Sequence, residues 1–524
     1  MMNIFKNSYG YSLMALILLG ISGNTNAQKP FDTEGMNIIF IVADDLGWSD
    51  TELYGTTSLY KTKNIERLAD RGLTFTNAYA ASPLCSPTRA TLLTGQASAR
   101  NGVVSAVGHI PKVLLKPELK PRARAGEKAI EVMSATRLNN ELPTLAKQMK
   151  ESGYATAHFG KWHLGSAPYT PLEHGFDVDV PHANTPGPAG GYLAPWKYTD
   201  FEPNYPGEHI EDRMSEEAIS WMKALDKEQP FFMNYWMFSV HGPWGGKKDL
   251  IEKYKQKVDI NNKQRSPSYA AMVHSMDDAV GALLDEVDRL GIADNTAIIF
   301  FSDNGGNMHT QLKEYNTDGK EYHAVVTDNA PLKGGKATMY EGGIRVPCVI
   351  VWPGLTSPGT KTDARIQSTD FYPTLLNLIG ASKPKDYPVD GIDFSPVLKD
   401  HKWERKAPMF TYFPAPAKGV PNWLPPAITV HDGKWKLIRL FHQGENQAHD
   451  YLLYDLEKDI SETKNLAAKY PKEVKRLDAL LEKHIKETGA VVPVPNPDFD
   501  STKYRPELIG VQNKKMLVEV NVGK

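Results

Sequence analysis

Two short apolar runs, residues 37–43 and 297–301, stand out along the chain. Both are rich in branched and aromatic residues, which is typical of strands buried on both faces of a sheet. Apolar residues at helical spacing, with charged residues opposite, predict amphipathic helices. They cover residues 65–71, 142–152, 213–225 and 269–290. This alternation predicts an α/β domain over residues 28–399, with a large, mostly parallel sheet sandwiched by helices.

The pattern changes after residue 399. Strand-like runs at residues 409–413, 427–431 and 434–441 precede one helical pattern at 471–488. A Pro-rich stretch at 491–497 favours extended chain, and the tail beyond it gives only weak signals. We therefore expect residues 400–524 to form a smaller C-terminal α+β subdomain with an antiparallel sheet, a helix and an extended tail.

The first 27 residues have the pattern of a signal peptide. Lys6 precedes an apolar run at residues 13–21, and the small residues Thr25 and Ala27 occupy the positions expected before a cleavage site. The run is too short to span a bilayer, no later segment resembles a membrane span, and no cysteine follows that could carry a lipid anchor. We expect an exported protein, periplasmic or secreted, without a membrane span.

Composition narrows the class of protein further. The chain has 524 residues, 41% of them hydrophobic, and a formal net charge of -2. This length supports a large core, and the balanced charge predicts no nucleic-acid partner. An exported protein with only two cysteines, Cys85 and Cys348, does not depend on disulfides for its stability.

Cys85 lies in the string Cys-Ser-Pro-Thr-Arg, followed by Thr94-Gly95. Ser86 is a favourable N-cap and Pro87 suits a first helical turn, so we expect a helix to begin here. The helix dipole and the charge of Arg89 would then favour an anion at Cys85, which suggests an activated thiolate. A single cysteine taken alone is more often a buried and inert thiol, so partners elsewhere in the chain must decide between the two.

Oxygen donors follow both predicted buried strands. Asp44 and Asp45 end the first strand, and Asp303 and Asn304 end the second. Because the carboxyl ends of parallel strands form the ligand crevice of an open α/β sheet, we expect these side chains to meet. Their hard oxygen atoms suit Ca²⁺, or Mg²⁺, and not Zn²⁺.

Three further segments carry basic side chains in motif-like settings. Gly-Lys-Trp-His-Leu-Gly at 160–165 puts Lys161 and His163 on one face if the backbone is extended. Lys336 lies among paired glycines that let the backbone turn or approach a ligand, and His241 is followed by Gly-Pro-Trp. Such side chains can hold an anion and move a proton, although a solvated lysine beside a core histidine would look the same.

Taken in order, these motifs resemble the formylglycine-dependent type I sulfatases of the alkaline phosphatase superfamily, in particular exported bacterial carbohydrate sulfatases. The first signature is Cys-x-Pro-x-Arg with Thr-Gly following, and the string around Lys161 is similar to the second. The resemblance covers nearly all of the mature chain. It implies that a maturation enzyme converts Cys85 to formylglycine, whose hydrated aldehyde attacks sulfur.

The same resemblance implies a role for each candidate residue. Asp44, Asp45, Asp303, Asn304 and the modified Cys85 would hold the cation. Arg89 would stabilise the hydrate, and Lys161 and Lys336 the sulfate. His241, with Lys336, would protonate the leaving alcohol, and His163 would take the proton that allows the sulfated intermediate to collapse.

The substrate is less defined by the sequence. Export and an aromatic, Gly/Pro-rich segment at 182–196 suggest a sulfated sugar, with His182, Trp196 and Trp244 as candidate contacts, although both tryptophans could equally be packing residues. Galactose or N-acetylgalactosamine sulfates are the first expectation. Two alternatives remain: a phosphonate or phosphate monoester hydrolase using the same groups, and a non-catalytic sugar-binding protein.

Overall fold

The computed structural model describes residues 35–512 and 516–522. All of them belong to one compact unit, Thr33–Lys524. The predicted signal peptide at residues 1–27 lies outside the described residues and stays a prediction. Among the described residues, no helix combines the length and the apolar character that a membrane crossing requires.

An eight-stranded sheet forms the centre of this unit, in the order β14-β2-β13-β10-β1-β8-β6-β7. Every strand runs parallel to β1 except β13, which is antiparallel to both β10 and β2. This confirms the predicted large, mostly parallel sheet. The strands are β1 (Asn37–Ala43), β2 (Leu73–Tyr79), β6 (Ala155–Gly160), β7 (Val178–Val180), β8 (Phe231–Trp236), β10 (Thr296–Ser302), β13 (Arg345–Val351) and β14 (Thr360–Gln367).

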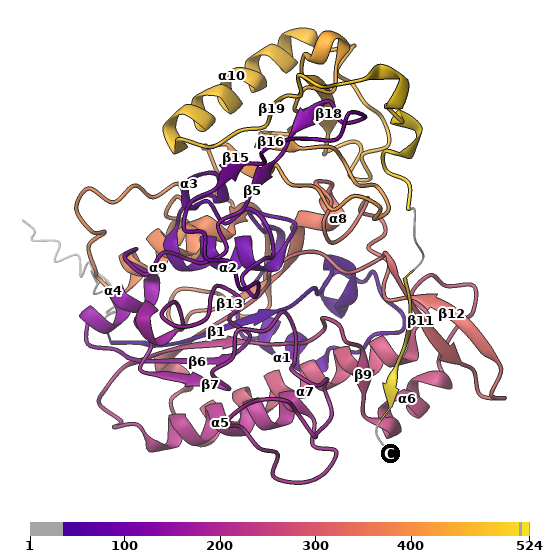
Figure 1. The fold of residues 1–524 in the computed structure, drawn as a ribbon. Helices are drawn as coiled ribbons and strands as arrows, with labels where there is room; N and C mark the ends of the chain where they lie inside the picture. Colours follow the sequence, from indigo (N-terminus) through magenta and orange to yellow (C-terminus); the bar gives the residue numbers. More distant parts are fainter. Residues whose placement is uncertain (1–34, 513–515, 523–524) are drawn as a thin grey trace, which may run out of the picture. The chain divides into compact units, whose positions relative to one another are not determined.

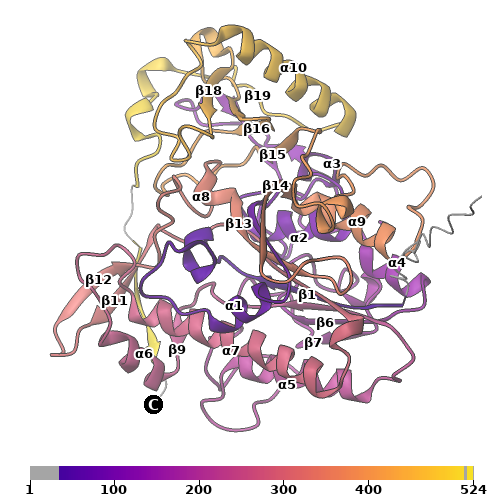
Figure 2. The same cartoon turned by 180° about the vertical axis from the view of Figure 1, so that it is seen from behind.

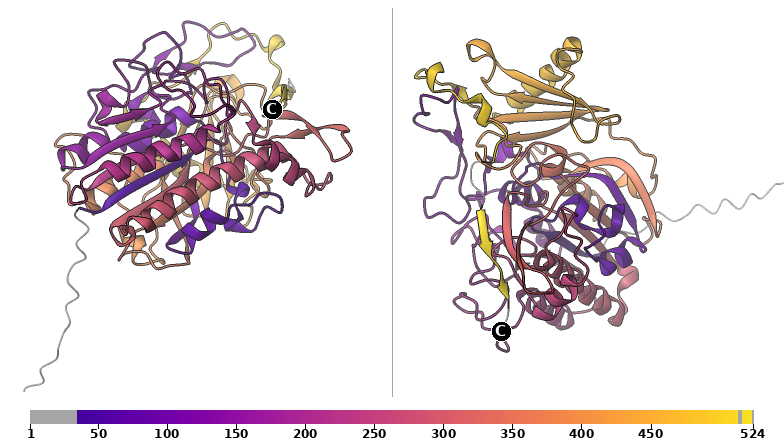
Figure 3. Two further views of the ribbon diagram at one scale, coloured as in Figure 1. Left: turned by 90° about the horizontal axis from the view of Figure 1, so that it is seen from below. Right: turned by 90° about the vertical axis from the view of Figure 1, so that its right-hand side faces the viewer.

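Helices cover both faces of this sheet (Figure 1 and Figure 2). The residues of β1 show why, because alternate side chains enter different cores: Ile39 and Ile41 join one hydrophobic cluster, and Ile38 and Phe40 the other. Figure 3 shows the two long helices α5 and α7 side by side beneath the sheet. The helices of this region are α1 (Lys63–Ala69), α2 (Cys85–Thr94), α3 (Ser98–Asn101), α4 (Leu145–Glu151), α5 (Ile210–Ala224), α6 (Lys248–Lys255), α7 (Pro267–Arg289), α8 (Glu341–Ile344) and α9 (Phe371–Leu378).

The four helices predicted from periodicity are all present, with ends shifted by a few residues. The prediction at 65–71 corresponds to α1, which begins two residues earlier, and the prediction at 142–152 corresponds to the shorter α4. Pro267 explains the start of α7: it occupies the first helical turn, where no backbone N–H is needed, and the Ser266 side chain caps the Tyr269 N–H.

A second, antiparallel sheet follows the order β15-β16-β17-β18, with α10 (Pro471–Thr488) packed against it (Figure 1). Leu477 and Leu481 of α10 are fully buried in a cluster with Ile428 and Leu437 of the sheet. This confirms the predicted smaller C-terminal unit. Its strands are β15 (Met409–Phe413), β16 (Ala427–Asp432), β17 (Trp435–Leu440) and β18 (Asp450–Asp455).

Short strands connect the two regions. The tail strand β20 (Met516–Glu519) pairs in parallel with β11, and β21 (Asn521–Val522) pairs with β9, so the tail crosses the predicted boundary at residue 399. That boundary stays a prediction. The remaining short strands are β3 (Glu118–Leu119), β4 (Ala129–Ile130), β5 (Val132–Met133), β9 (Gly245–Gly246), β11 (Thr310–Tyr315), β12 (Glu321–Val325) and β19 (Val494–Pro495).

Candidate active site

Three carboxylates and one amide meet at the carboxyl edge of the central sheet. Strands β1 and β10 are neighbours, with Ala43 opposite Ser302, so the residues after both strands emerge side by side. One oxygen each of Asp44, Asp45 and Asp303 lie within 4.8 Å of one another, and all three residues are buried. The sequence prediction that these donors would converge agrees with this geometry.

Hydrogen bonds fix part of this cluster and leave part of it open. The Asn304 amide donates to Asp45 Oδ1 at 2.8 Å, and the Asp45 backbone N–H donates to Asp303 Oδ1 at 3.1 Å. Asp44 Oδ1 and Asn304 Oδ1 are buried and accept no hydrogen bond from the described residues. Buried oxygens without a donor are costly, and these two, with the neighbouring carboxylates, have the chemistry of a Ca²⁺ or Mg²⁺ site.

The cluster also shifts the pKa values of its own carboxyl groups. Burial, reinforced by the charge of Asp44, raises the pKa of Asp303 to about 7. Burial acts in the same direction on Asp45, but Lys336 and then His241 outweigh it and hold the pKa of Asp45 well below its usual range. A divalent cation would remove the repulsion that Asp303 experiences.

Cys85 is the first residue of α2 and is 1% exposed. The predicted cap is wrong: Leu84, not Ser86, is the N-cap residue, and the Ser86 hydroxyl instead donates to the His163 carbonyl at 2.7 Å. Pro87 does lie in the first turn. Burial raises the pKa of the Cys85 thiol, against the opposing charge of Lys161, which disfavours the thiolate form of the unmodified residue.

Arg89 follows Cys85 by four residues, so both project from the same side of α2. It is fully buried, and its Nε donates to Asp303 Oδ2 at 2.9 Å. Its Nη1 donates to the Lys161 carbonyl at 2.7 Å, which fixes the backbone after β6. Arg89 thus joins the acidic cluster, the helix of Cys85 and the segment of Lys161.

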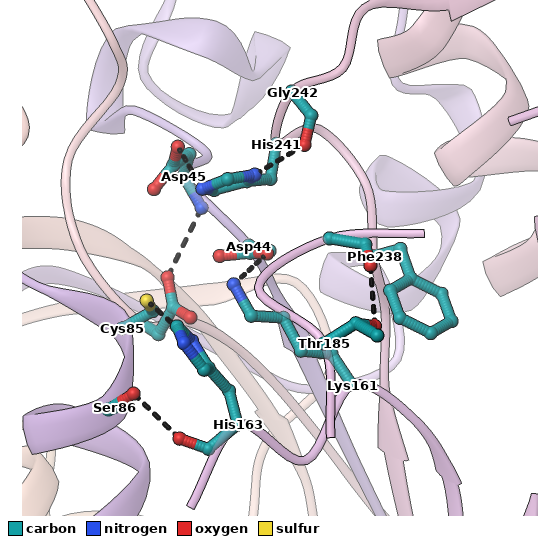
Figure 4. A network of polar contacts seen from close by, with 12 residues as sticks. Asp44, Asp45, Cys85, Ser86, Lys161, His163, Thr185, Phe238, His241 and Gly242 are labelled. Carbon is teal, nitrogen blue, oxygen red and sulfur yellow. Dashed lines mark hydrogen bonds and ion pairs between the residues drawn. The ribbon is translucent and has the colours of Figure 1, made fainter. Parts of the chain in front are cut away.

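Two lysines balance two of the carboxylates. Lys161 Nζ lies 2.6 Å from Asp44 Oδ2 (Figure 4). Lys336 Nζ lies 2.7 Å from Asp45 Oδ2. Burial opposes the charge of Lys336, but Asp45 outweighs it and raises the pKa of Lys336 above its usual range. Gly160 enables the approach of Lys161: at φ 103°, a Cβ there would lie 2.0 Å from the Trp236 carbonyl oxygen.

His163 and His241 face the same centre from opposite sides (Figure 4). His163 Nδ1 lies 3.5 Å from Cys85 Sγ, and His241 Nε2 lies 3.8 Å from Asp45 Oδ2. His163 adopts φ 57°, so the assumption of extended backbone from Lys161 to His163 is wrong, although both side chains reach the site. Burial and then Lys336 lower the pKa of His241 to about 3, and burial and then Lys161 hold the pKa of His163 well below its usual value.

Sequence reasoning missed two histidines. His109 Nδ1 lies 2.7 Å from His163 Nε2, which places a second imidazole behind the first. His309 is mostly buried with an unpartnered Nδ1, and burial followed by the charge of Lys336 lowers its pKa to about 4. Both lie in irregular segments outside any motif, so only the fold brings them to the site.

The three candidate substrate residues differ from one another. Trp196 and Trp244 are only 9% and 8% exposed and belong to the core cluster beneath the sheet, which favours the packing role over a sugar platform. Trp196 stacks on Phe201. His182 is exposed and pairs with Asp179 at 2.7 Å, beside a cavity of about 220 Å³. Cys348 is buried in β13, as an apolar strand residue should be.

The chain is similar to known proteins over most of its length. Residues 36–381 match the family model "Sulfatase", and residues 335–490 match "N-sulphoglucosamine sulphohydrolase, C-terminal". A sulfatase of Formosa agariphila is 30% identical over 88% of this chain and 89% of its own, and the N-acetylgalactosamine-6-sulfatase of Rattus norvegicus is 32% identical over 76% and 71%. The solved structure of Ps i-CgsB in complex with k-i-k-neocarrahexaose aligns with a TM-score of 0.67 and 25% identity, over 90% of this chain and 95% of the other.

Proposed function

The chain belongs to the sulfatase family and is a sulfuric ester hydrolase, and from this premise we propose that its substrate is a sulfated carbohydrate. Galactose and N-acetylgalactosamine sulfates are the first candidates. The observation that carries the proposal is the single buried site in which Cys85, three carboxylates, Arg89 and two lysines converge. Similarity to an N-acetylgalactosamine-6-sulfatase and to a structure solved with a carrageenan oligosaccharide supports the choice of sugar.

Sulfatases generally use a metal ion and a formylglycine. In this chain Asp44, Asp45, Asp303 and Asn304 would hold the cation, and we propose Ca²⁺, with Mg²⁺ as the alternative, because all four offer oxygen ligands. When bound, the cation supplies positive charge beside position 85, and formylglycine at that position supplies the hydrated aldehyde as nucleophile. A maturation enzyme that acts on Cys85 is therefore a proposed partner.

Sulfate recognition falls to the two lysines. Lys161 and Lys336 each neutralise one carboxylate, and a cation held by those carboxylates would leave both ammonium groups free for sulfate oxygens. Charge that develops on those oxygens in the transition state is then stabilised by groups already in place. Arg89, fixed by Asp303, orients the residue at position 85.

The two histidines divide the proton transfers. His163 Nδ1 lies 3.5 Å from Cys85 Sγ, where formylglycine would carry oxygen instead of sulfur, so His163 is the base for the collapse of the sulfated intermediate. His241 donates its Nδ1–H to the Gly242 carbonyl at 2.6 Å, which aims Nε2 toward the leaving-group side. An anionic ester in the site raises the pKa of His241 and allows it to act as an acid.

Export to the periplasm or the medium accompanies this proposal, on the pattern of residues 1–27. It agrees with a substrate that is a glycan outside the cytoplasm.

The test is a substrate panel in which an aryl sulfate is matched by the corresponding aryl phosphate. The matured protein is incubated with 6-O-sulfated galactose, 6-O-sulfated N-acetylgalactosamine, an aryl sulfate and the corresponding aryl phosphate, and released sulfate and phosphate are measured by ion chromatography. We expect sulfate release that a Cys85→Ala variant loses. Faster release of phosphate than of sulfate would assign the site to a phosphoester hydrolase instead.

A further inference from the structure

Three segments far apart in the sequence form a groove on the C-terminal side of the chain: residues 120–131, 416–426 and 498–509. Two hollows of about 260 and 950 Å³ share Arg124, Glu127, Glu131 and Lys418 in their walls, so they are continuous. The Asn496 amide donates to the carbonyls of Arg124 and Glu127 at 3.0 and 2.8 Å, which fixes one segment against another. We name this feature the basic groove.

The charge of the basic groove differs from that of the whole chain, whose net charge is only -2. Seven basic and three acidic side chains line it: Lys120, Arg122, Arg124, Lys128, Lys418, Lys503 and Arg505, against Glu127, Glu131 and Asp498. Walls of one predominant sign concentrate the field in a hollow and attract ligands of the opposite sign.

Two of these cations are free to bind a ligand. Lys120 lies 2.6 Å from Glu131, and Lys418 lies 2.6 Å from Glu127, so both glutamates are already paired. The guanidinium groups of Arg122 and Arg124 are exposed and make no hydrogen bond or ion pair with the described residues. A guanidinium binds sulfate oxygens through two parallel N–H groups.

Aromatic and proline surfaces accompany the charges. Lys128 Nζ lies 4.8 Å from the centre of the Tyr504 ring, and Trp423, Pro425 and Pro426 line the same hollow. Trp423 is anchored by its indole N–H, which donates to the Leu508 carbonyl at 3.1 Å. Apolar faces beside free guanidinium groups match a sugar ring that carries a sulfate better than they match a small inorganic anion.

The groove also shares a hydrophobic cluster with the segment that precedes α2, the helix that begins at Cys85. Leu84, which precedes Cys85, and Leu424, which follows Trp423, belong to one hydrophobic cluster, with Val420 packed against it. The wall of the groove and the start of α2 therefore rest on the same core.

We propose that the basic groove binds a second, non-reacting sulfated unit of the substrate, so that the substrate is an oligosaccharide with several sulfates. This inference rests on the proposed function. It concerns affinity for the part of the oligosaccharide beyond the reacting sugar, and assigns that affinity chiefly to Arg122 and Arg124.

Binding is measured first, without turnover. A Cys85→Ala protein is titrated by calorimetry with ι-carrageenan oligosaccharides, with the same oligosaccharides after desulfation, and with duplex DNA of similar length, at several salt concentrations. Adding Arg122→Ala and Arg124→Ala should weaken binding of the sulfated oligosaccharide about three- to tenfold and flatten its salt dependence. The matched control removes two exposed lysines of α10, Lys472→Ala and Lys475→Ala, and should bind as the parent does.

Turnover gives the second readout. In the protein with Cys85 intact, the double arginine variant should lower kcat/KM for the oligosaccharide relative to kcat/KM for a small aryl sulfate, through KM. Equal affinity of the arginine and lysine variants, or equal binding of desulfated oligosaccharide or DNA, would overturn the proposal. Binding is measured in Cys85→Ala and turnover in the protein with Cys85 intact, so the two results are independent. Binding of the oligosaccharide without any release of sulfate would contradict the proposed function but not the proposed role of the groove.

Discussion

Lys436 offers a sharp test of how the two sheets are joined. It is fully buried in β17, with Nζ at 3.0 Å from Glu341 Oε1 and 2.8 Å from Glu462 Oε1. Glu341 begins α8, five residues after Lys336, and accepts the Tyr79 hydroxyl at 2.8 Å. One lysine thus lies between two buried carboxylates, beside the segment that carries Lys336, which we propose binds sulfate.

We predict that Lys436→Met destabilises the protein strongly. Methionine fills much of the volume but removes the charge shared by the two carboxylates. As a permanent positive charge Glu341 then keeps only the more distant Arg345, at 3.8 Å, and Glu462 has no ion-pair partner among the described residues. Breaking a buried pair in this way costs about 3–5 kcal/mol. At about 1 °C per kcal/mol for a chain of this size, Tm should fall by about 3–5 °C. Lys458→Met, at an exposed lysine, is the matched control and should change stability by less than about 0.5 kcal/mol.

The dependence on pH separates lost charge from lost packing. Burial raises the pKa of Glu462 to about 7 from 4.5, even with Lys436 beside it. A carboxyl whose folded pKa is raised supports the folded state fully below pH 4.5, and this support is lost as pH rises through about 7. Without Lys436 the carboxylates take up protons still more readily, so the deficit of Lys436→Met against the parent should be larger at pH 8 than at pH 5.

Calorimetric or fluorescence melting at both pH values, with all three proteins, measures this directly. A deficit of the same size at pH 5 and pH 8, or no larger than that of Lys458→Met, would refute the assignment of a charge-neutralising role to Lys436.

Three other predictions concern the active site. Chelation should abolish sulfate release and lower Tm, because the three clustered carboxylates would then lose the divalent charge that offsets their mutual repulsion. Asp303→Ala should lose activity as well. Full activity after metal removal, confirmed by elemental analysis, would exclude the site. His163→Ala should form the sulfated intermediate and stall, giving at most one product per enzyme and an adduct on the peptide of residue 85. His241→Ala should slow turnover of a sugar sulfate more than turnover of an activated aryl sulfate, whose phenol leaves without a proton. Equal losses on both substrates for His241→Ala, with no adduct for His163→Ala, would contradict these roles. His109→Ala should slow the same step as His163→Ala, but less severely, because His109 orients the His163 ring through Nε2. His109→Gln should recover part of the rate. An effect on the KM for aryl sulfate alone would speak against this positioning role.

Much of the site was predictable because it follows from strands. Asp44 and Asp303 come directly after apolar runs that could only be buried, and adjacent parallel strands deliver such residues to one edge. Local signals were weaker guides. Ser86 looked like a helix cap, but its hydroxyl has a tertiary partner in the His163 carbonyl, and Leu84 takes the cap position.

Other features have no local signal at all. His109 and His309 become neighbours of the catalytic groups only when loops fold over the sheet edge. The strand β20 pairs with β11 across some two hundred residues of sequence, which no periodicity in a short polar tail could indicate. Trp196 and Trp244 looked equally suited to sugar contact and to packing. In the fold they are buried in the same cluster as residues of α5 and α7, two helices that the sequence predicts as separate elements.

The most direct test of the account is the chemical state of residue 85 against turnover. Protein is produced with graded amounts of a maturation enzyme, the peptide containing residue 85 is quantified by mass spectrometry, and sulfate release is measured on the same samples. We predict that kcat rises in proportion to the fraction of residue 85 that is formylglycine, and that it extrapolates to zero when this fraction is zero. Full sulfate release from protein whose residue 85 is entirely unmodified cysteine would contradict it.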